Sequence, residues 1–110
     1  MDCLFCKIAA GEIPSQKVYE DDAMLAFRDI EPKAPVHILL IPKVHLDGVR
    51  ALTADNAAVV AHIFAKIPEI AASLGVTDYR VVTNNGAAAG QSVQHLHFHL
   101  LGGRTLGEMG

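Results

Sequence analysis

Histidine recurs at every second position of residues 95–99, where His95, His97 and His99 alternate with apolar side chains. Side chains alternate across a β-strand, so a strand over residues 93–101 would put the three imidazoles on one face, roughly 7 Å apart. Each ring has two nitrogens that need partners, which makes such a row a costly way to fill a core. A solvated polar face is the simpler alternative, but the pattern favours a chemical site.

Two chemistries suit this row of imidazoles. In the first, two or three of the histidines bind one metal ion, as neutral imidazole commonly binds zinc, and the metal activates water. In the second, the lone pair of His97 attacks phosphorus. The loop at residues 84–92 favours the second chemistry, because its small residues let backbone N–H groups approach an anion and Ser92 offers a hydroxyl donor. A phosphate held there would lie against the His97 ring.

Composition limits the possible partners. The 110 residues fit one domain over residues 1–110, and the net charge is −3 with nine basic residues scattered singly. A nucleic-acid backbone needs a basic cluster that this sequence lacks, whereas a small phosphorylated ligand needs only a few donors. Apolar runs fall short of the ~18 residues of a membrane span, and the first residues lack the basic and apolar regions of a secretory signal. We therefore expect a cytoplasmic protein that binds neither nucleic acid nor membrane.

Periodicity and turn residues predict the elements that position these groups. We expect a short helix over residues 3–10, a long helix from an N-cap at Thr53 to a stop at Gly75, and strands over 17–20, 23–28, 36–41, 79–83 and 93–101. The long helix should direct to the core Val60, Ile63, Phe64, Ile67, Ile70 and Leu74. Pro68 should kink or restart this helix. The order indicates an α+β fold, a meander-like five-stranded antiparallel sheet with the helices on one side.

The sequence resembles the histidine-triad (HIT) family of nucleotide hydrolases and transferases, and within it the histidine-triad nucleotide-binding proteins or purine nucleoside phosphoramidases. Besides the triad, the matching segments are Glu-Ile-Pro at 12–14, Ala-Phe-Arg-Asp-Ile at 26–30, prolines at 32 and 35, Ile-Pro-Lys-Val-His at 41–45, Gly-Gln-Ser-Val at 90–93 and Leu-Gly-Gly-Arg at 101–104. The galactose-1-phosphate uridylyltransferase branch carries Gln where this chain has His99. Histidine there favours hydrolysis over transfer.

The resemblance implies a role for each matching position. His97 would attack the α-phosphorus and carry the nucleotidyl group until water releases the nucleoside monophosphate. His99 would hydrogen-bond the phosphate or leaving group, and His37 would support the triad and relay protons. Ser92 would contact the leaving group or a phosphate oxygen. The other nucleotide-binding residues would be Asp29 at the ribose hydroxyls, Asn84, Gly90 and Gln91 near the phosphate, and Ile8, Ile13, Phe27 and Ile30 around the base.

The cysteine pair Cys3-x-x-Cys6 indicates a metal or redox site in a reducing compartment. His45 and His95 could complete a closed Cys₂His₂ tetrahedron, which is a structural zinc site and resembles an arrangement in several family members. The alternative is a pair of reduced thiols without a ligand. The resemblance also implies a homodimer in which two five-stranded sheets join into one of ten strands.

These observations predict a hydrolase that cleaves purine nucleoside 5′-phosphoramidates, AMP or GMP joined to an amine, through a nucleotidyl-His97 intermediate. We expect structural zinc and no organic cofactor. Two alternatives stay open. A metal-dependent hydrolase with the triad as ligands would lose activity with a chelator, and a nucleotide sensor would bind nucleotide without turnover or adduct.

Overall fold

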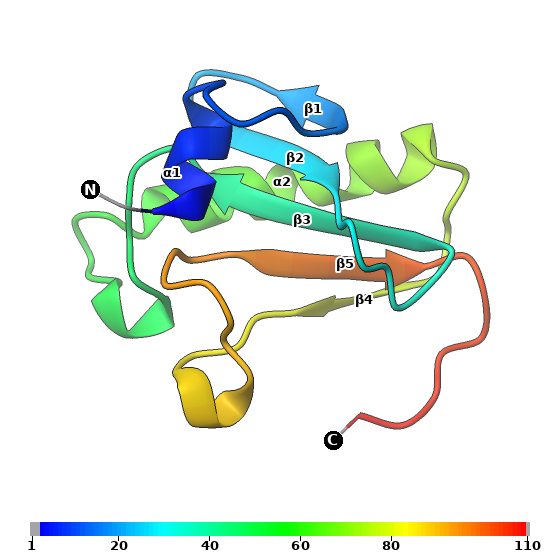
Figure 1. The fold of residues 1–110 in the computed structure, drawn as a ribbon. Helices are drawn as coiled ribbons and strands as arrows, with labels where there is room; N and C mark the ends of the chain where they lie inside the picture. The colour runs from blue at the N-terminus through cyan, green and yellow to red at the C-terminus, as the bar shows by residue number, and fades with distance from the viewer. Residues whose placement is uncertain (1–2, 110) are drawn as a thin grey trace.

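The computed structural model describes residues 3–109 (Figure 1). Two helices and five strands follow one another as α1 (Leu4–Ala9), β1 (Lys17–Glu20), β2 (Met24–Arg28), β3 (Val36–Pro42), α2 (Ala58–Ser73), β4 (Tyr79–Val82) and β5 (Phe98–Gly102). Single-turn 3₁₀ helices lie at Val49–Ala51 and Ala87–Ala89. The strands form one antiparallel sheet in the order β1-β2-β3-β5-β4. The predicted α+β fold with a five-stranded antiparallel sheet is confirmed, but the sheet is a meander only through β3, because β5 lies between β3 and β4.

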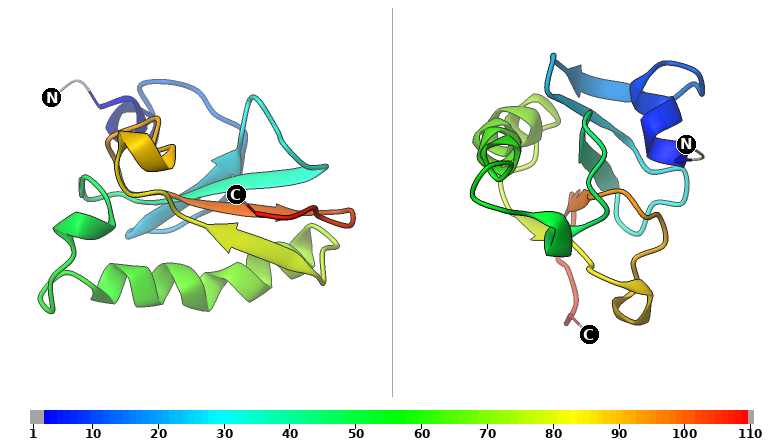
Figure 2. Two further views of the ribbon diagram at one scale, coloured as in Figure 1. Left: turned by 90° about the horizontal axis from the view of Figure 1, so that it is seen from below. Right: turned by 90° about the vertical axis from the view of Figure 1, so that its left-hand side faces the viewer.

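The two helices lie on opposite faces of the sheet (Figure 2), so the prediction that both pack on one side is wrong. The reason lies in the central strands, which are apolar on both faces. From β2 and β3, Met24, Ala26, Ile38 and Leu40 pack with α2, while Leu25, Phe27, Leu39 and Ile41 pack with α1. Continuous apolar runs of this kind are typical of strands buried on both faces.

The long helix starts later than predicted. Thr53 accepts hydrogen bonds at its hydroxyl from the Asp55 N–H and at its carbonyl from Asn56 and Ala57, so it caps a turn that precedes α2. The helix then runs through Pro68 as one element and ends before Gly75, whose φ of 74° fits the predicted left-handed stop.

Packing of α2 also differs at one position. Ile63, Ile67 and Ile70 are buried as predicted, but Phe64 is 46% exposed and meets the Phe98 ring edge-on at 5.2 Å between centroids. Because Pro68 has no N–H, the Phe64 carbonyl loses its helical donor, and its position on the exposed side lets water replace that donor.

Strand β5 begins at Phe98, five residues later than predicted, so only His99 of the triad lies in the sheet. The backbone ahead of it bonds elsewhere: the Leu96 N–H donates to the Leu46 carbonyl, and the His97 carbonyl accepts from the Thr83 hydroxyl at 2.7 Å. The alternation nevertheless continues into this lead-in segment. Leu96 joins the α2 side of the core, while His95 and His97 are buried on the other side.

The register aligns residues of four strands in rows on the α1 face. One row consists of Phe27, Leu39, His99 and Val82, and the next of Asp29, His37, Leu101 and Arg80. Helix α1 packs over β2 and β3, which leaves the β5 and β4 end of these rows uncovered (Figure 1). Within residues 3–109, no helix has the length and apolar character needed to cross a membrane.

Candidate active site and metal centre

A cavity of about 1200 Å³ opens on the α1 face of the sheet, above the two aligned rows. It brings together eight residues that the sequence assigned to the nucleotide or to catalysis: Ile8, Phe27, Asp29, Ile30, His37, Asn84, Ser92 and His99. Ile13 packs behind the wall in the α1 cluster, and Ile30 is 95% exposed at the rim. The cavity is therefore large and apolar at the α1 end, with polar groups converging near His99.

His97 lies beside the cavity, in contact with two residues that line it. Its side chain is buried, and its ring centroid lies 5.0 Å from that of Phe5 and 5.1 Å from that of His99, both of which line the cavity. The Nδ1 atom is 2.7 Å from the backbone carbonyl of His95. A carbonyl only accepts, so Nδ1 carries the proton and Nε2 keeps its lone pair. The fold thereby leaves His97 with one free nucleophilic nitrogen.

The same reasoning assigns the protons of His37 and His99. The backbone N–H of Lys33 donates to His37 Nδ1 at 3.0 Å, so the neutral His37 ring carries its proton on Nε2. His37 Nε2 lies 2.9 Å from His99 Nδ1 and donates its proton to it, so the proton of the neutral His99 ring is on Nε2. We call Lys33 N–H, His37 and His99 the relay.

Burial keeps both rings of the relay neutral. Burial lowers the pKa of His99 to about 4, with further lowering from the neighbouring His97 and His37. Burial also lowers the pKa of His37, against the opposing effect of Asp29. At neutral pH His99 is therefore a hydrogen-bond donor through Nε2 and not a cationic acid.

Asp29 stands beside the relay at the cavity edge. Its Oδ1 accepts the backbone N–H of Glu31 at 2.8 Å, and its Oδ2 lies 3.4 Å from His37 Nε2. The second carboxylate oxygen thus faces the cavity side of the site, where a pair of hydroxyl donors could bond it. The ribose role of Asp29 stays a prediction.

The loop at residues 84–92 presents Asn84 and Ser92 to the cavity, and Val93 directly after it also lines the cavity. The Gly90 N–H, by contrast, donates to the Ala87 carbonyl inside the loop. The Gln91 amide is buried, accepting the Gly86 N–H and donating to the Asp47 and Val93 carbonyls. Gly90 and Gln91 therefore shape the loop, and its side chains at the cavity are the ones that can meet a phosphate.

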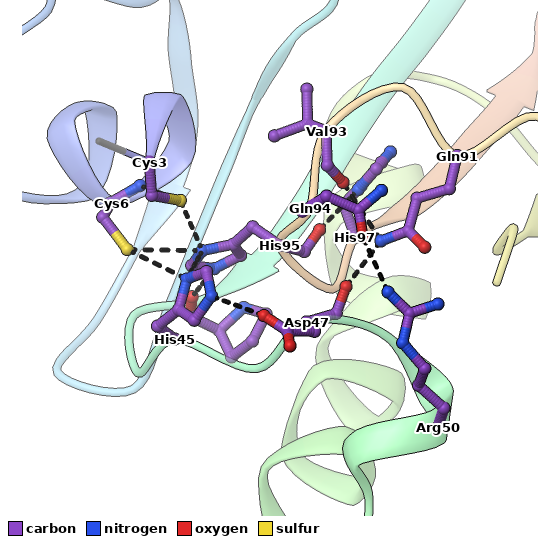
Figure 3. Close-up of polar contacts among 11 residues, drawn as sticks. Cys3, Cys6, His45, Asp47, Arg50, Gln91, Val93, Gln94, His95 and His97 are labelled. Atoms are coloured by element: carbon purple, nitrogen blue, oxygen red, sulfur yellow. Dashed lines mark hydrogen bonds and ion pairs between the residues drawn. The ribbon is translucent and has the colours of Figure 1, made fainter. Parts of the chain in front are cut away.

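Cys3, Cys6, His45 and His95 form a second cluster at the base of α1, which we call the Cys/His cluster (Figure 3). Their four ligand atoms all lie within 4.8 Å of one another. His95 Nε2 donates to the Pro42 carbonyl at 2.8 Å, and His45 Nε2 donates to Asp47 at 2.9 Å. Both Nδ1 lone pairs therefore face the two sulfur atoms.

The distances in this cluster fit a tetrahedral ion. Nδ1 of His45 and Nδ1 of His95 are 3.2 Å apart, and the Cys3 and Cys6 sulfurs lie 3.3 and 3.5 Å from His95 Nδ1. Zinc bond lengths of ~2.0 Å to nitrogen and ~2.3 Å to sulfur give tetrahedral edges of about 3.3–3.8 Å. Without a cation, burial and the Cys3 thiol raise the pKa of Cys6 to about 11.

The two clusters divide the triad. Among residues 3–109, His95 belongs to the Cys/His cluster and His99 groups with Asp29 and His37, while His97 belongs to neither set. The three triad nitrogens do not converge, which is evidence against the alternative of a metal-dependent hydrolase with the triad as ligands.

Several site residues escaped the sequence analysis. Phe5 contacts the rings of both His95 and His97, and its position between the two cysteines was the available signal. Asp47 orients His45 from two residues away, a spacing that could have been read. The Lys33 backbone N–H leaves no trace in the side-chain pattern, because any residue except proline supplies it.

Comparison with known proteins agrees with this geometry. The HIT domain family model matches residues 10–106. The chain is 53% identical to an uncharacterised HIT-like protein of Synechocystis over 94% of this chain and 91% of that protein. It is 42% identical to the purine nucleoside phosphoramidase of Escherichia coli over 98% of this chain and 92% of that enzyme.

A solved structure extends the agreement to the fold. The HIT family hydrolase from Clostridium thermocellum superposes with a TM-score of 0.95 at 45% identity, covering 98% of this chain and 96% of that one. The family match spans most of the chain, and the full-length likenesses confirm the predicted resemblance. This chain therefore belongs to the HIT family.

Proposed function

We propose that this protein hydrolyses purine nucleoside 5′-phosphoramidates through a covalent nucleotidyl-His97 intermediate. The observation that carries the proposal is the hydrogen bond from His97 Nδ1 to the His95 carbonyl, which leaves the Nε2 lone pair free to attack. The 42% identity to a purine nucleoside phosphoramidase supports the substrate class.

The chemistry would proceed in two displacements. His97 Nε2 attacks the α-phosphorus, a phosphorus–imidazole bond forms, and the phosphorus–amine bond breaks. The departing nitrogen takes up a proton as the phosphorus–nitrogen bond breaks, while His99 Nε2–H donates to a phosphate oxygen. Water then attacks phosphorus and the phosphorus–imidazole bond breaks, which releases the nucleoside monophosphate and one proton and leaves His97 neutral with its proton on Nδ1.

The cavity supplies a place for each part of the nucleotide. The base would lie at the apolar α1 end against Phe27 and Ile8, with the ribose hydroxyls on Asp29. The phosphate would sit at His99 with Ser92 and Asn84 as further donors. Asp29→Ala should weaken nucleoside binding and leave metal content unchanged.

We also propose that the Cys/His cluster holds a structural zinc ion. Cys3, Cys6, His45 and His95 would be its four ligands, which fills a tetrahedron and leaves no position for a substrate. The ion would supply the positive charge that the buried Cys3 thiolate and the half-buried Cys6 thiolate need, and would fix α1 against β3 and the lead-in to β5. A reducing compartment such as the cytoplasm would keep the thiols available.

We infer a homodimer in which β4 joins its counterpart across a two-fold axis. The sheet has two edges, and β1 is a poor one because its register with β2 is irregular and its ends carry Lys17 and Glu20. Strand β4 is the other edge of the sheet, and its register with β5 is regular. Sedimentation should give twice the mass of the chain, and a monomer would contradict the inference.

The test of the catalytic proposal is release of AMP from an adenosine phosphoramidate. Wild type should release AMP with and without an added chelator during the assay, and His97→Ala should release none while still binding AMP. If the wild type bound the nucleotide and released nothing, the protein would be a nucleotide sensor instead.

A further inference from the structure

The loop at residues 84–92, which we call the phosphate loop, is closed by one buried side chain. Gln91 is only 4% exposed. Its backbone N–H donates to the Gly86 carbonyl at 3.1 Å, and its Oε1 accepts the Gly86 N–H at 2.8 Å. Asn84 and Ser92 lie just outside this closure, one on each side, and both line the cavity. Closing the loop therefore fixes the two proposed phosphate donors relative to each other.

A neighbouring segment, residues 47–50, holds the closed loop from outside, and we call it the brace. Gln91 Nε2 donates to the Asp47 carbonyl (Figure 3). The Arg50 backbone N–H donates to Asn85 Oδ1 at 2.9 Å. Because the two hydrogen bonds join different parts of the loop to different parts of the brace, they fix the orientation of the loop as well as its position.

Glycine at position 48 lets the brace and the phosphate loop lie this close together. A Cβ atom on Gly48 would lie 3.0 Å from Asn85 Oδ1 and 3.3 Å from Gln91 Oε1, which is tighter than ordinary van der Waals contact. The Gly48 backbone is extended, with φ at 171°, a conformation that any residue adopts. The contact with the loop, and not the backbone conformation, therefore requires glycine here.

We propose that Gln91 is a positioning residue for phosphate binding, which holds Asn84 and Ser92 where their side chains can donate to the phosphate. Both N–H groups of its amide go to backbone carbonyls and its oxygen accepts a backbone N–H, so Gln91 acts through its neighbours and not by touching the nucleotide. Donors that are fixed before the ligand arrives lose little conformational freedom on binding. This role rests on the proposed nucleotide site and adds the residue that holds its phosphate end.

The experiment measures the affinities of AMP and of adenosine by calorimetric titration, because the two ligands differ only in the phosphate. Wild type should bind AMP more tightly than adenosine. Gln91→Met has a side chain of similar length without the amide, and it should lower the ratio of the AMP affinity to the adenosine affinity about 10-fold, the contribution of one hydrogen bond to a charged group. The adenosine affinity itself should change less than about twofold, since the base and ribose sites lie outside the loop.

Gly48→Ala disturbs the same contact without removing a hydrogen-bonding group, and it decides the question if Gln91→Met does not fold. Its Cβ would displace the loop by a few tenths of an ångström, so the affinity ratio should fall by a smaller factor. Tyr19→Phe is the matched control. It removes a 2.7 Å hydrogen bond to Asp21 on the α2 side of the sheet, and it should lower Tm without changing the affinity ratio.

An unchanged affinity ratio in Gln91→Met and Gly48→Ala, or equal losses of AMP and adenosine affinity, would overturn the positioning role. A ratio that fell as far in Tyr19→Phe would also overturn it, because general loss of stability would then explain the effect. Wild type that bound neither ligand would contradict the nucleotide site itself, whereas a preference for AMP that survived in both loop variants would contradict only the role of Gln91.

Discussion

Histidine donates a proton in the relay and offers a lone pair to a metal in the Cys/His cluster. In each case the partner of one ring nitrogen decides whether the other nitrogen carries a proton or a lone pair. His45 and His95 donate Nε2–H to oxygen acceptors, so their Nδ1 lone pairs are free to bind a metal. His37 receives a backbone N–H at Nδ1, so its Nε2 must carry a proton. The Asp29, His37 and His99 atoms are near enough for an ion, but that tautomer makes the trio a donor chain.

His97 stands between the two regions and depends on both. Its Nδ1 proton goes to the backbone carbonyl of His95, whose side chain belongs to the Cys/His cluster. Its ring contacts His99, the end of the relay. The comparison therefore shows that His97 meets both regions: the His95 carbonyl fixes its tautomer on one side, and the His99 ring packs against it on the other.

The largest expected effect comes from removing the residue between the clusters. His97→Ala should lower kcat by more than about a thousandfold, because it removes the attacking nitrogen while Asp29 and His99 still bind nucleotide. Steady-state kinetics and AMP titration check this. A variant that kept a tenth of the wild-type kcat would show that another group attacks phosphorus.

Removing the metal should lower the thermal stability of the protein through the Cys/His cluster and not through the relay. Overnight treatment of the protein with a strong chelator should lower Tm by roughly 10 °C or more, since metal bound only to the folded state adds its binding energy to folding. Cys3→Ser/Cys6→Ser should start at the lower Tm and not respond to the chelator. If the purified wild type contained no zinc and its Tm did not change with the chelator, the two cysteines would be reduced thiols without a metal.

The relay can be cut without touching the Cys/His cluster. His37→Leu should lower kcat about 10- to 100-fold with a smaller change in KM, because His99 loses the donor that fixes its Nε2–H toward the phosphate. His37→Gln, whose amide can donate to His99 Nδ1, should recover part of the loss. Zinc content measured by mass spectrometry should match wild type in both variants. Equal damage from Leu and Gln would point to packing instead of the donor.

The smallest effect is a pH dependence of stability. His99 has a folded pKa of about 4 against an ordinary value near 6.5, so the unfolded chain binds more protons between these pH values. This contribution to stability is complete above pH 6.5 and is lost as the pH falls to 4, so Tm should fall over this range. The Tm of His99→Gln should fall less over this pH range. Metal release and other effects of acid act on both proteins, so the difference between them reports His99. Parallel pH curves for the two proteins would contradict the assignment.

Much of the fold was predictable because strong local patterns encode it. The strands at residues 17–20 and 79–82 and the stop at Gly75 follow from alternation and turn residues. The placement of α1 opposite α2 was not predicted, because short apolar strands do not show which face a six-residue helix will cover. The late start of β5 was missed because long-range bonds of Leu96 and His97 decide it.

The candidate site divides in the same way. Side-chain identity indicated which residues gather, and the cavity and the Cys/His cluster do collect most of them. The sequence could not show which ring nitrogen of each histidine carries the proton, because the tautomers depend on backbone groups such as the Lys33 N–H and the His95 carbonyl. Gly90 and Gln91 were assigned to the phosphate because small and polar residues suit it, but their hydrogen bonds lie within the loop and to the Asp47 carbonyl.

The most direct test identifies the ring nitrogen that carries the nucleotidyl group. Wild type should be quenched during turnover of an adenosine phosphoramidate, and the modified histidine examined by peptide mass spectrometry and by phosphorus and nitrogen NMR. The account predicts a single adduct on Nε2 of His97, because Nδ1 is held by the His95 carbonyl. An adduct on Nδ1 of His97, or on any other residue, would contradict it.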